Sequence, residues 1–300
     1  MGILFIQVCL IGLSLFCLTA CATAPSQKAL TLQGFSKPLK PGDIVETSGG
    51  SSISFETLIQ NLSRVAIVYV GETHTSPEDH QLQLNILKGL YARNPSLILA
   101  MEMFPREVQP LLDQYAQGSI TEGDFLQKEN WAKNWGFPFD LYRGILHWAR
   151  ARQLKIVGLN APKEVVDQVA RGGLTALSPS DKSRLAAEFQ PVSPEQREYL
   201  EQHYAMHPRG SIKDFETFFQ AQRAWEETMA ETLAMAAVSL HPGQQIVALI
   251  GKGHVAHQWG VPRLTRLRIP ASYRTVLTVP MNYPFRILKP SMADYLCITE

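Results

Sequence analysis

Two copies of a short motif, Gly-x-x-His, contain the residues best suited to chemistry in this chain. One copy ends at His74 and the other at His254, and each directly follows an apolar, β-branched run. Glu72 stands inside the first copy, Glu102 lies within a third apolar run, and Asn160 ends a fourth. Imidazoles and carboxylates together ligate a divalent metal or exchange protons with a bound substrate. These residues therefore predict a catalytic or metal-binding site.

Each of these residues also has a plain structural explanation. A histidine after a strand most often serves a loop or a helix cap, and the glycines of the motif favour a tight turn. Glu102 is more informative because Met101 and Met103 flank it, and an unpaired charge buried in such a run is costly. Its carboxylate is expected to face a polar cleft or to pair with a nearby Arg or with backbone amides.

The elements that would position these residues alternate between short apolar runs and longer helical patterns. This alternation predicts an α/β fold with a mostly parallel sheet flanked by helices. Core strands are expected at 65–70, 96–103, 155–159 and 245–250, an edge strand at 274–279, and helices at 78–93, 105–115 and 141–152. In such a sheet, ligands bind beyond the carboxyl ends of the strands, and the four polar groups would converge there.

The stretch from 163 to about 240 shows no strand pattern and is expected to be a helical insertion before the last core strand. Its helices are predicted at 163–171, 180–188, 194–206 and 214–240. The third of them carries Tyr199, His203 and Tyr204, and His207 directly follows its end. Tyrosine and histidine ligate haem iron, so this segment is a candidate porphyrin site. The alternative is an exposed helix end rich in helix-terminating residues.

The N-terminus predicts export and lipidation. Residues 1–20 are apolar and contain no Asp, Glu, Lys or Arg. Leu18-Thr19-Ala20-Cys21 matches a bacterial lipobox, in which the cysteine receives lipid, such as palmitate, and becomes the mature N-terminus. The expected organisation is a lipoprotein signal peptide at 1–20, the lipidated Cys21 and a tether at 21–54, and one α/β domain at 55–300.

Other features of this region bear on where the protein is held. Ala22, rather than an aspartate, follows the cysteine, which resembles sorting to the bacterial outer membrane. No Lys or Arg precedes the apolar segment, so an uncleaved membrane anchor is the alternative to a lipoprotein.

Charge and cysteine content limit the remaining classes. The formal net charge is +1, which gives no reason to expect nucleic acid as a partner. Cys9 and Cys17 lie in the expected signal peptide and Cys21 would carry lipid, so only Cys297 remains in the domain. The domain therefore has no disulfide framework and must be stabilised by its core.

Several ordered motifs carry a resemblance to a known family. They are GETH at 71–74, LAMEMF at 99–104, Asn160-Ala161-Pro162, QRAWEETMA at 222–230 and GKGHVAHQWGVP at 251–262. Across residues 55–285 the chain resembles the ChaN-like haem-binding uptake lipoproteins, in one superfamily with Tiki, TraB and the erythromycin esterases. The resemblance implies haem binding for iron uptake at the cell surface. It also implies tyrosine-based ligation, for which Tyr204 ranks first, then Tyr199 and Tyr142, with His203 and His207 nearby.

Two functional hypotheses follow. The first is an envelope lipoprotein that binds haem, with the interface between the two copies of a homodimer as one expected site, and exchanges it with an outer-membrane haem receptor. The second is a metal-dependent hydrolase, because the Tiki relatives resemble metalloproteases with paired Gly-x-x-His motifs and a Glu. In that hypothesis His74, Glu102 and His254 hold a divalent metal or relay protons, and Glu72 or Glu102 acts as the general base. A purely structural envelope lipoprotein is the third possibility.

Overall fold

The sheet at the centre of the molecule has the parallel order that the alternating pattern predicts. The computed structural model describes residues 29–206 and 214–300. Within these residues the main sheet has eight strands in the order β3-β2-β10-β8-β4-β7-β5-β6. The strands are β2 (Ile44–Glu46), β3 (Ser51–Ser52), β4 (Ile67–Glu72), β5 (Leu97–Pro105), β6 (Lys155–Asn160), β7 (Gln245–Gly251), β8 (Tyr273–Pro280) and β10 (Tyr295–Thr299). The six strands from β10 to β6 run parallel, which confirms the α/β class.

The prediction of an edge strand near 274–279 is wrong, because β8 lies inside the sheet. It pairs with β4 on one side and with β10 on the other. β10 is short and stands close to the C-terminus, and β2 and β3 extend the sheet beyond it in antiparallel pairs. The apolar residues of β8 are therefore buried, including Val276 and Leu277.

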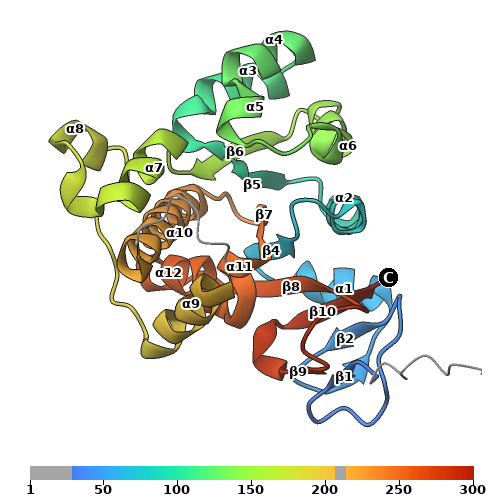
Figure 1. The fold of residues 1–300 in the computed structure, drawn as a ribbon. Coiled ribbons are helices and arrows are strands. Elements are labelled where there is room, and N and C mark those ends of the chain that lie inside the picture. The colour runs from blue at the N-terminus through green and yellow to red at the C-terminus, as the bar shows by residue number, and fades with distance from the viewer. Residues whose placement is uncertain (1–28, 207–213) are drawn as a thin grey trace, which may run out of the picture.

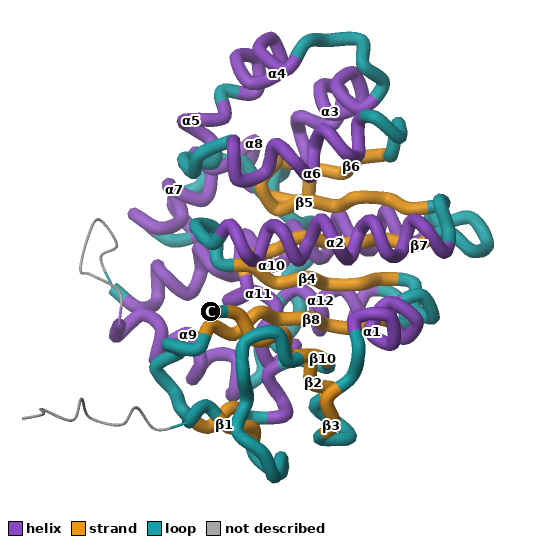
Figure 2. The backbone as a smooth tube through the Cα atoms, turned by 90° about the vertical axis from the view of Figure 1, so that its right-hand side faces the viewer, coloured by secondary structure: helices purple, strands orange, loops and turns teal. Residues whose placement is uncertain are grey.

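Helices cover both faces of this sheet, as Figures 1 and 2 show. One layer contains α1 (Phe55–Leu62), α2 (Pro77–Arg93), α3 (Gln109–Ala116), α4 (Glu122–Glu129), α5 (Trp131–Asn134) and α6 (Asp140–Arg150). Successive strand residues alternate between the two faces. Val68 and Val70 of β4 therefore pack with the first layer, whereas Ile67 and Tyr69 pack against α10 and α12 on the other side.

The second layer comes mostly from the predicted helical insertion between β6 and β7. It contains α7 (Lys163–Gly172), α8 (Pro179–Lys182), α9 (Pro194–Met206) and α10 (Phe215–Val238), and α11 (Lys252–Val255) and α12 (Val261–Arg268) follow β7. The helix α8 is shorter than the predicted 180–188. In the part of the chain that the structure describes, no helix is long and apolar enough to cross a membrane.

Much of the segment expected to be a tether is part of the fold. Leu30, Leu32, Leu39 and Val45 are buried, so the assignment of 21–54 as a tether is wrong from Leu30 onwards. The strand β1 (Thr31–Leu32) pairs with β9 (Ile287–Leu288), and β2 pairs with β10. These strands are too short to show a periodic pattern of apolar residues. The prolines and serines around β1 and β2 made the segment resemble a tether.

Candidate functional site

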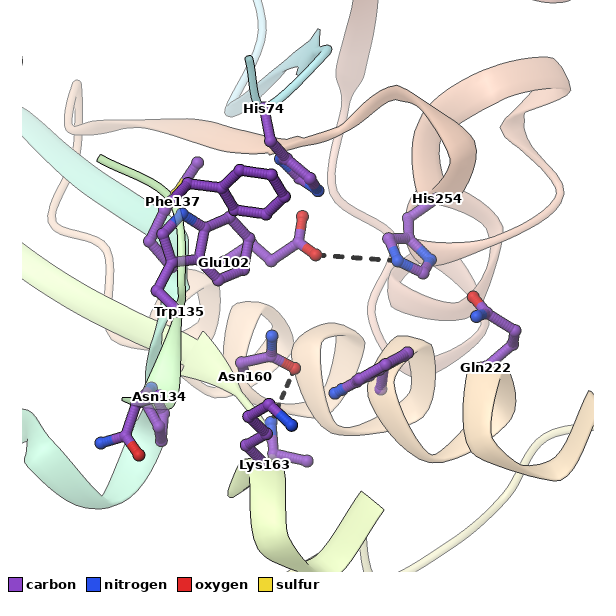
Figure 3. A pocket seen from close by; sticks show the side chains of 13 residues that line it. His74, Glu102, Asn134, Trp135, Phe137, Asn160, Lys163, Gln222 and His254 are labelled. Atoms are coloured by element: carbon purple, nitrogen blue, oxygen red, sulfur yellow. Dashed lines mark hydrogen bonds and ion pairs between the residues drawn. The ribbon is translucent and has the colours of Figure 1, made fainter. Parts of the chain in front are cut away.

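Four strand ends meet at a cavity of about 330 Å³ at the carboxyl edge of the sheet. We call it the strand-end cavity, and Figure 3 shows the side chains that line it. They are His74, Glu102, Met103, Pro105, Asn134, Trp135, Phe137, Asn160, Ala161, Lys163, Gln222, Trp225 and His254. The predicted His74, Glu102, Asn160 and His254 therefore do converge.

Glu72 does not line this cavity, but it holds His74 in place through a hydrogen bond. It is buried, and its two oxygens contact four side chains. Oε1 accepts hydrogen bonds from His74 Nδ1 and from the Tyr142 hydroxyl, each at 2.8 Å. Oε2 accepts one from Gln83 Nε2 at 2.8 Å and lies 3.1 Å from His80 Nδ1. Both oxygens of Glu72 are thus occupied, so this carboxylate positions His74 and does not face a ligand.

The charge state of Glu72 follows from these contacts. Burial raises the pKa of a carboxyl, but the hydrogen bonds from His74 and His80 outweigh it and lower the pKa of Glu72 to about 2. Burial likewise lowers the pKa of His80, but the hydrogen bond and charge of Glu72 outweigh it and raise this pKa. An ionised carboxylate accepts only, so His74 Nδ1 carries the proton of this hydrogen bond, and Nε2 is the ring nitrogen left toward the cavity.

His254 has a carboxylate of its own on the opposite side of the cavity. Its Nδ1 lies 3.0 Å from Glu226 Oε1, and Gln196 Nε2 donates to Glu226 Oε2 at 2.7 Å. Its Nε2 faces Glu102 Oε1 at 3.7 Å. Burial lowers the pKa of His254, but the hydrogen bond to Glu226 and the charge of Glu102 outweigh it and raise this pKa. His254 therefore favours the protonated form more than a free imidazole does.

Glu102 owes its position to an irregularity in β5. The pairing of β5 with β6 shifts register between Met101 and Pro105, and such a bulge re-aims side chains. The backbone N–H of Gly251 donates to Glu102 Oε2. In Figure 3 the carboxylate points into the space between the two imidazoles.

Gly251 also allows the side chains of His74 and Glu102 to lie close to its backbone, because it has no side chain of its own. A Cβ atom at this position would lie 2.8 Å from His74 Cε1 and 3.3 Å from Glu102 Oε2. The glycine of the second Gly-x-x-His copy thus serves close packing as well as the turn.

The prediction of a metal site is not supported. Among residues 29–206 and 214–300, no group of three or more His, Cys, Asp or Glu side chains is arranged to hold a metal ion. The Nδ1 atoms of His74 and His254 are engaged by Glu72 and Glu226, and Glu102 Oε2 is engaged by Gly251. The two Nε2 atoms and Glu102 Oε1 are the donor and acceptor atoms left toward the cavity, and they suit the exchange of protons with a bound molecule.

The predicted tyrosines and histidines of the helical insertion do not form one group. Tyr199 and His203 are four residues apart, share one face of α9, and have ring centroids 4.0 Å apart. Tyr204 faces another side and packs on Phe215 and Phe218. His207 lies outside the described residues.

Tyr142 is unsuited to bind haem iron. Its side chain is fully buried and its hydroxyl is held by Glu72. Burial and the charge of Glu72 raise its pKa, but burial raises the pKa of Tyr199 as well, so the engaged hydroxyl is what distinguishes Tyr142. Tyr142 is therefore a partner of Glu72.

A second cavity, the α9 cavity, lies beside Tyr199 and His203. It has a volume of about 210 Å³ and is lined by Tyr199, Gln202, His203, His257, Tyr283, Phe285, Ile287, Lys289 and Met292. Phe285 is 60% exposed and Ile287 67% exposed, although both are large and apolar. Burial, Lys289 and His203 lower the pKa of His257, which keeps its imidazole neutral.

A third, connecting cavity of about 290 Å³ joins the two regions. It shares His74, Gln222 and His254 with the strand-end cavity, and Tyr199 and His203 with the α9 cavity. The connecting cavity thus shares lining residues both with the polar strand ends and with the α9 cavity.

Sequence reasoning missed Glu226 and the aromatic wall of the strand-end cavity. Glu226 stands in the QRAWEETMA segment, and its signal was a carboxylate on the buried side of a largely apolar helix, where it needs a partner. The rings of Trp135 and Phe137 lie 4.7 and 5.0 Å from the His74 ring. They come from the connection between α5 and α6, for which no element was predicted.

The fold and the cavities define a class: an α/β protein with a polar site at the carboxyl edge of a parallel sheet and a helical insertion beside it. A family model described as "Haem-binding uptake, Tiki superfamily, ChaN" matches residues 58–264. The chain belongs to this family, which confirms the resemblance inferred from its motifs.

One solved structure has the same fold, and two weaker likenesses are given after it. The structure reported as cofacial heme binding to ChaN of Campylobacter jejuni matches with a TM-score of 0.67 and 19% identity, over 86% of this chain and 98% of that one. A mutant of the erythromycin esterase EreC in its open conformation matches with a TM-score of 0.47 and 14% identity, over 80% and 76%. The chloroplastic protein RETICULATA-RELATED 5 of Arabidopsis thaliana is 28% identical over 130 residues, which cover 41% of this chain but only 17% of that protein.

Proposed function

We propose that this protein binds haem at the α9 cavity as a lipid-anchored envelope protein of iron uptake. The observation that carries the proposal is the composition of this cavity in a member of a haem-binding family. It combines exposed apolar side chains, tyrosine and histidine donors, and a lysine. A porphyrin needs these three kinds of group for its ring, its iron and its propionates.

The residues fit these roles individually. Tyr199 offers a phenol oxygen for ferric iron, and its hydroxyl has no hydrogen-bond partner among the described residues. Neutral His257 offers a nitrogen close by, because its ring centroid lies 5.5 Å from that of Tyr199. Phe285 and Ile287 offer apolar surface for the ring, and Lys289 a charge for a propionate. Tyr199 therefore replaces Tyr204 as the preferred iron ligand.

The size of the cavity supports binding between two copies of the chain. Ligand pockets that enclose a drug-sized molecule hold roughly 300–1,000 Å³. The α9 cavity, at about 210 Å³, can enclose only part of a porphyrin. The rest of the ring would lie over Phe285 and Ile287, where a second copy would cover it. The cofacial haem reported for the Campylobacter jejuni ChaN is consistent with such a homodimer.

The position of the N-terminus favours a site close to a membrane. Thr31 of β1 pairs with Ile287, which itself lines the α9 cavity. Only eight positions separate Cys21 from Ala29, the first described residue. A chain of that length spans at most roughly 28 Å. Lipid on Cys21 would therefore hold the cavity near the outer membrane, within reach of a haem receptor.

A hemin titration tests the proposal. We expect the chain from Cys21 onwards to develop a saturable Soret band, and Tyr199→Phe to shift the band and weaken binding at least tenfold. Tyr204→Phe is the matched control, because this tyrosine lies on the same helix outside the cavity, and it should bind as the wild type does. Equal binding by Tyr199→Phe and the wild type would overturn this placement. Loss of palmitate labelling in Cys21→Ala tests the anchor.

A further inference from the structure

A further cavity of about 410 Å³ lies between α12 and the start of β8. We call it the α12–β8 cavity. Its lining residues are Gln258, Arg266, Pro270, Ala271, Ser272, Tyr273, Arg274 and Asp294. None of them lines the strand-end cavity or the α9 cavity, so haem binding gives this region no role. Its volume lies in the range of small-molecule sites.

Two arginines bring positive charge to this cavity from different elements. Arg266 lies on α12 and Arg274 lies on β8, and both side chains are exposed. Arg268, on the same helix as the first, pairs with Glu227 at 2.8 Å. Neither of the two lining arginines has such a carboxylate partner in the part of the chain that the structure describes. Two like charges thus border one cavity without a paired counter-ion.

The hydroxyl group of Tyr273 shows that the two guanidinium groups converge. Burial raises the pKa of Tyr273, and the charges of Arg266 and Arg274 both oppose this rise. Exposed charges act on a group in this way only when they lie near it, because solvent and salt screen distant ones. An anion beside this hydroxyl would therefore be attracted by both arginines.

The other polar side chains of the lining retain hydrogen-bond donors. Gln258 Oε1 accepts from the Tyr273 hydroxyl at 2.8 Å, which leaves Nε2 as the other end of the amide. Ser272 Oγ accepts from the Ala66 N–H at 3.0 Å, which leaves its own hydroxyl hydrogen available. Together with the guanidinium groups, which only donate, these donors favour an anionic ligand.

The backbone at Gln258 is strained, and the strain brings its amide to this cavity. The angle φ is +61° at Gln258 and +58° at His257, in the left-handed region that a glutamine seldom occupies. Such conformations persist where the surrounding structure enforces them, and they are concentrated at binding sites. Here the hydrogen bond from Tyr273 holds the glutamine side chain in place.

We propose that the α12–β8 cavity binds a small phosphate ester that carries hydroxyl groups. Its phosphate lies between Arg266 and Arg274, because a guanidinium fork matches phosphate oxygens. A tetrahedral phosphate accepts hydrogen bonds from several directions, which suits donors on separate elements better than a planar carboxylate does. The cavity is also much larger than a bare phosphate ion, so it has room for an organic part.

Asp294 explains why the organic part carries hydroxyl groups. It is the only carboxylate among the described residues that line the cavity. Its Oδ2 accepts from the Thr275 N–H at 2.8 Å and from the Thr275 hydroxyl at 2.7 Å. Its Oδ1 is therefore the atom left to accept a hydrogen bond from a ligand hydroxyl group.

Isothermal titration calorimetry with glycerol 3-phosphate tests the proposal on the chain from Cys21 onwards. We expect saturable binding that weakens about tenfold or more in Arg266→Gln and in Arg274→Gln. Both side chains are exposed, so these variants should keep the wild-type Tm. The matched control is Arg152→Gln, because this exposed arginine stacks on Trp148 outside the cavity. Absence of binding, or equal binding by the wild type and both variants, would overturn the proposal.

Two comparisons define the ligand more closely. Asp294→Asn removes a negative charge and should tighten the binding of inorganic phosphate, but it should reduce the preference for glycerol 3-phosphate over inorganic phosphate. An unchanged preference would contradict the role of the hydroxyl groups. Sedimentation with phosphatidylglycerol vesicles separates the two sources of the ester: vesicle binding that Arg266→Gln weakens identifies a lipid headgroup, and binding of the soluble ester alone identifies a free molecule. Hemin binding should be the same in Arg266→Gln and the wild type.

Discussion

Replacing Glu72 with glutamine removes the most heavily hydrogen-bonded carboxylate near the site. The substitution keeps the size of the side chain and loses only its charge and part of its accepting capacity. His80, which is buried against Glu72, then has no counter-charge, and Tyr142 and His74 compete for a single amide oxygen. Removing one partner of a buried charged pair is strongly destabilising.

The magnitude follows from the titration of Glu72. A pKa lowered from 4.5 to about 2 corresponds to about 3 kcal/mol of folded-state stability at neutral pH. Because the folded-state pKa is the lower one, this contribution is complete above about pH 4.5 and is lost as the pH falls toward 2. For a domain of this size, about 3 kcal/mol lowers the Tm by about 6–12 °C.

Thermal unfolding of Glu72→Gln, followed by circular dichroism at several pH values, measures this effect. We expect the full decrease in Tm at pH 7 and a decrease that becomes smaller between pH 4.5 and 2. Glu56→Gln is the control, because Glu56 pairs with Arg93 on the surface and should shift the Tm little. A Glu72→Gln protein as stable as this control at pH 7, or a difference independent of pH, would refute the reasoning.

Three further predictions concern packing and surface. Gly251→Ala should lower stability, because its Cβ would lie 2.8 Å from His74 Cε1; thermal unfolding measured beside the wild type checks it. Leu30→Ala should cost about 2–5 kcal/mol in urea denaturation, whereas exposed Lys37→Ala should cost almost nothing; equal effects would restore the tether interpretation. Phe285→Ser should leave the Tm unchanged but weaken hemin binding and haem-dependent dimerisation, as seen in light scattering with and without hemin.

The parallel core could be predicted because its strands are long, β-branched runs buried on both faces. The runs at 67–72 and 245–251 needed nothing more than their composition to be recognised. The strands β1, β2, β9 and β10 could not, because they are short and gain their stability from partners distant in sequence, such as Thr31 with Ile287. Because the short strand β10 could not be predicted, β8 was expected at the edge of the sheet, although β10 lies beyond it.

Site residues that lie at the end of a strand could be predicted from the sequence. A site residue that a helix supplies could not. The positions of His74, Glu102 and His254 follow from the topology of a parallel sheet. The carboxylate partner of His254 does not, since Glu226 reaches it from helix α10. Sequence spacing alone also placed Tyr199 and Tyr204 in one group, whereas α9 turns them to different sides.

A crystal structure of the chain from Cys21 onwards with bound hemin tests the central claim most directly. We expect the iron within bonding distance of the Tyr199 oxygen, with the ring over Phe285 and Ile287 and a second copy against its open face. The strand-end cavity, with His74 and His254, should stay free of haem. Iron between those two imidazoles, or bound by Tyr204, would contradict the account.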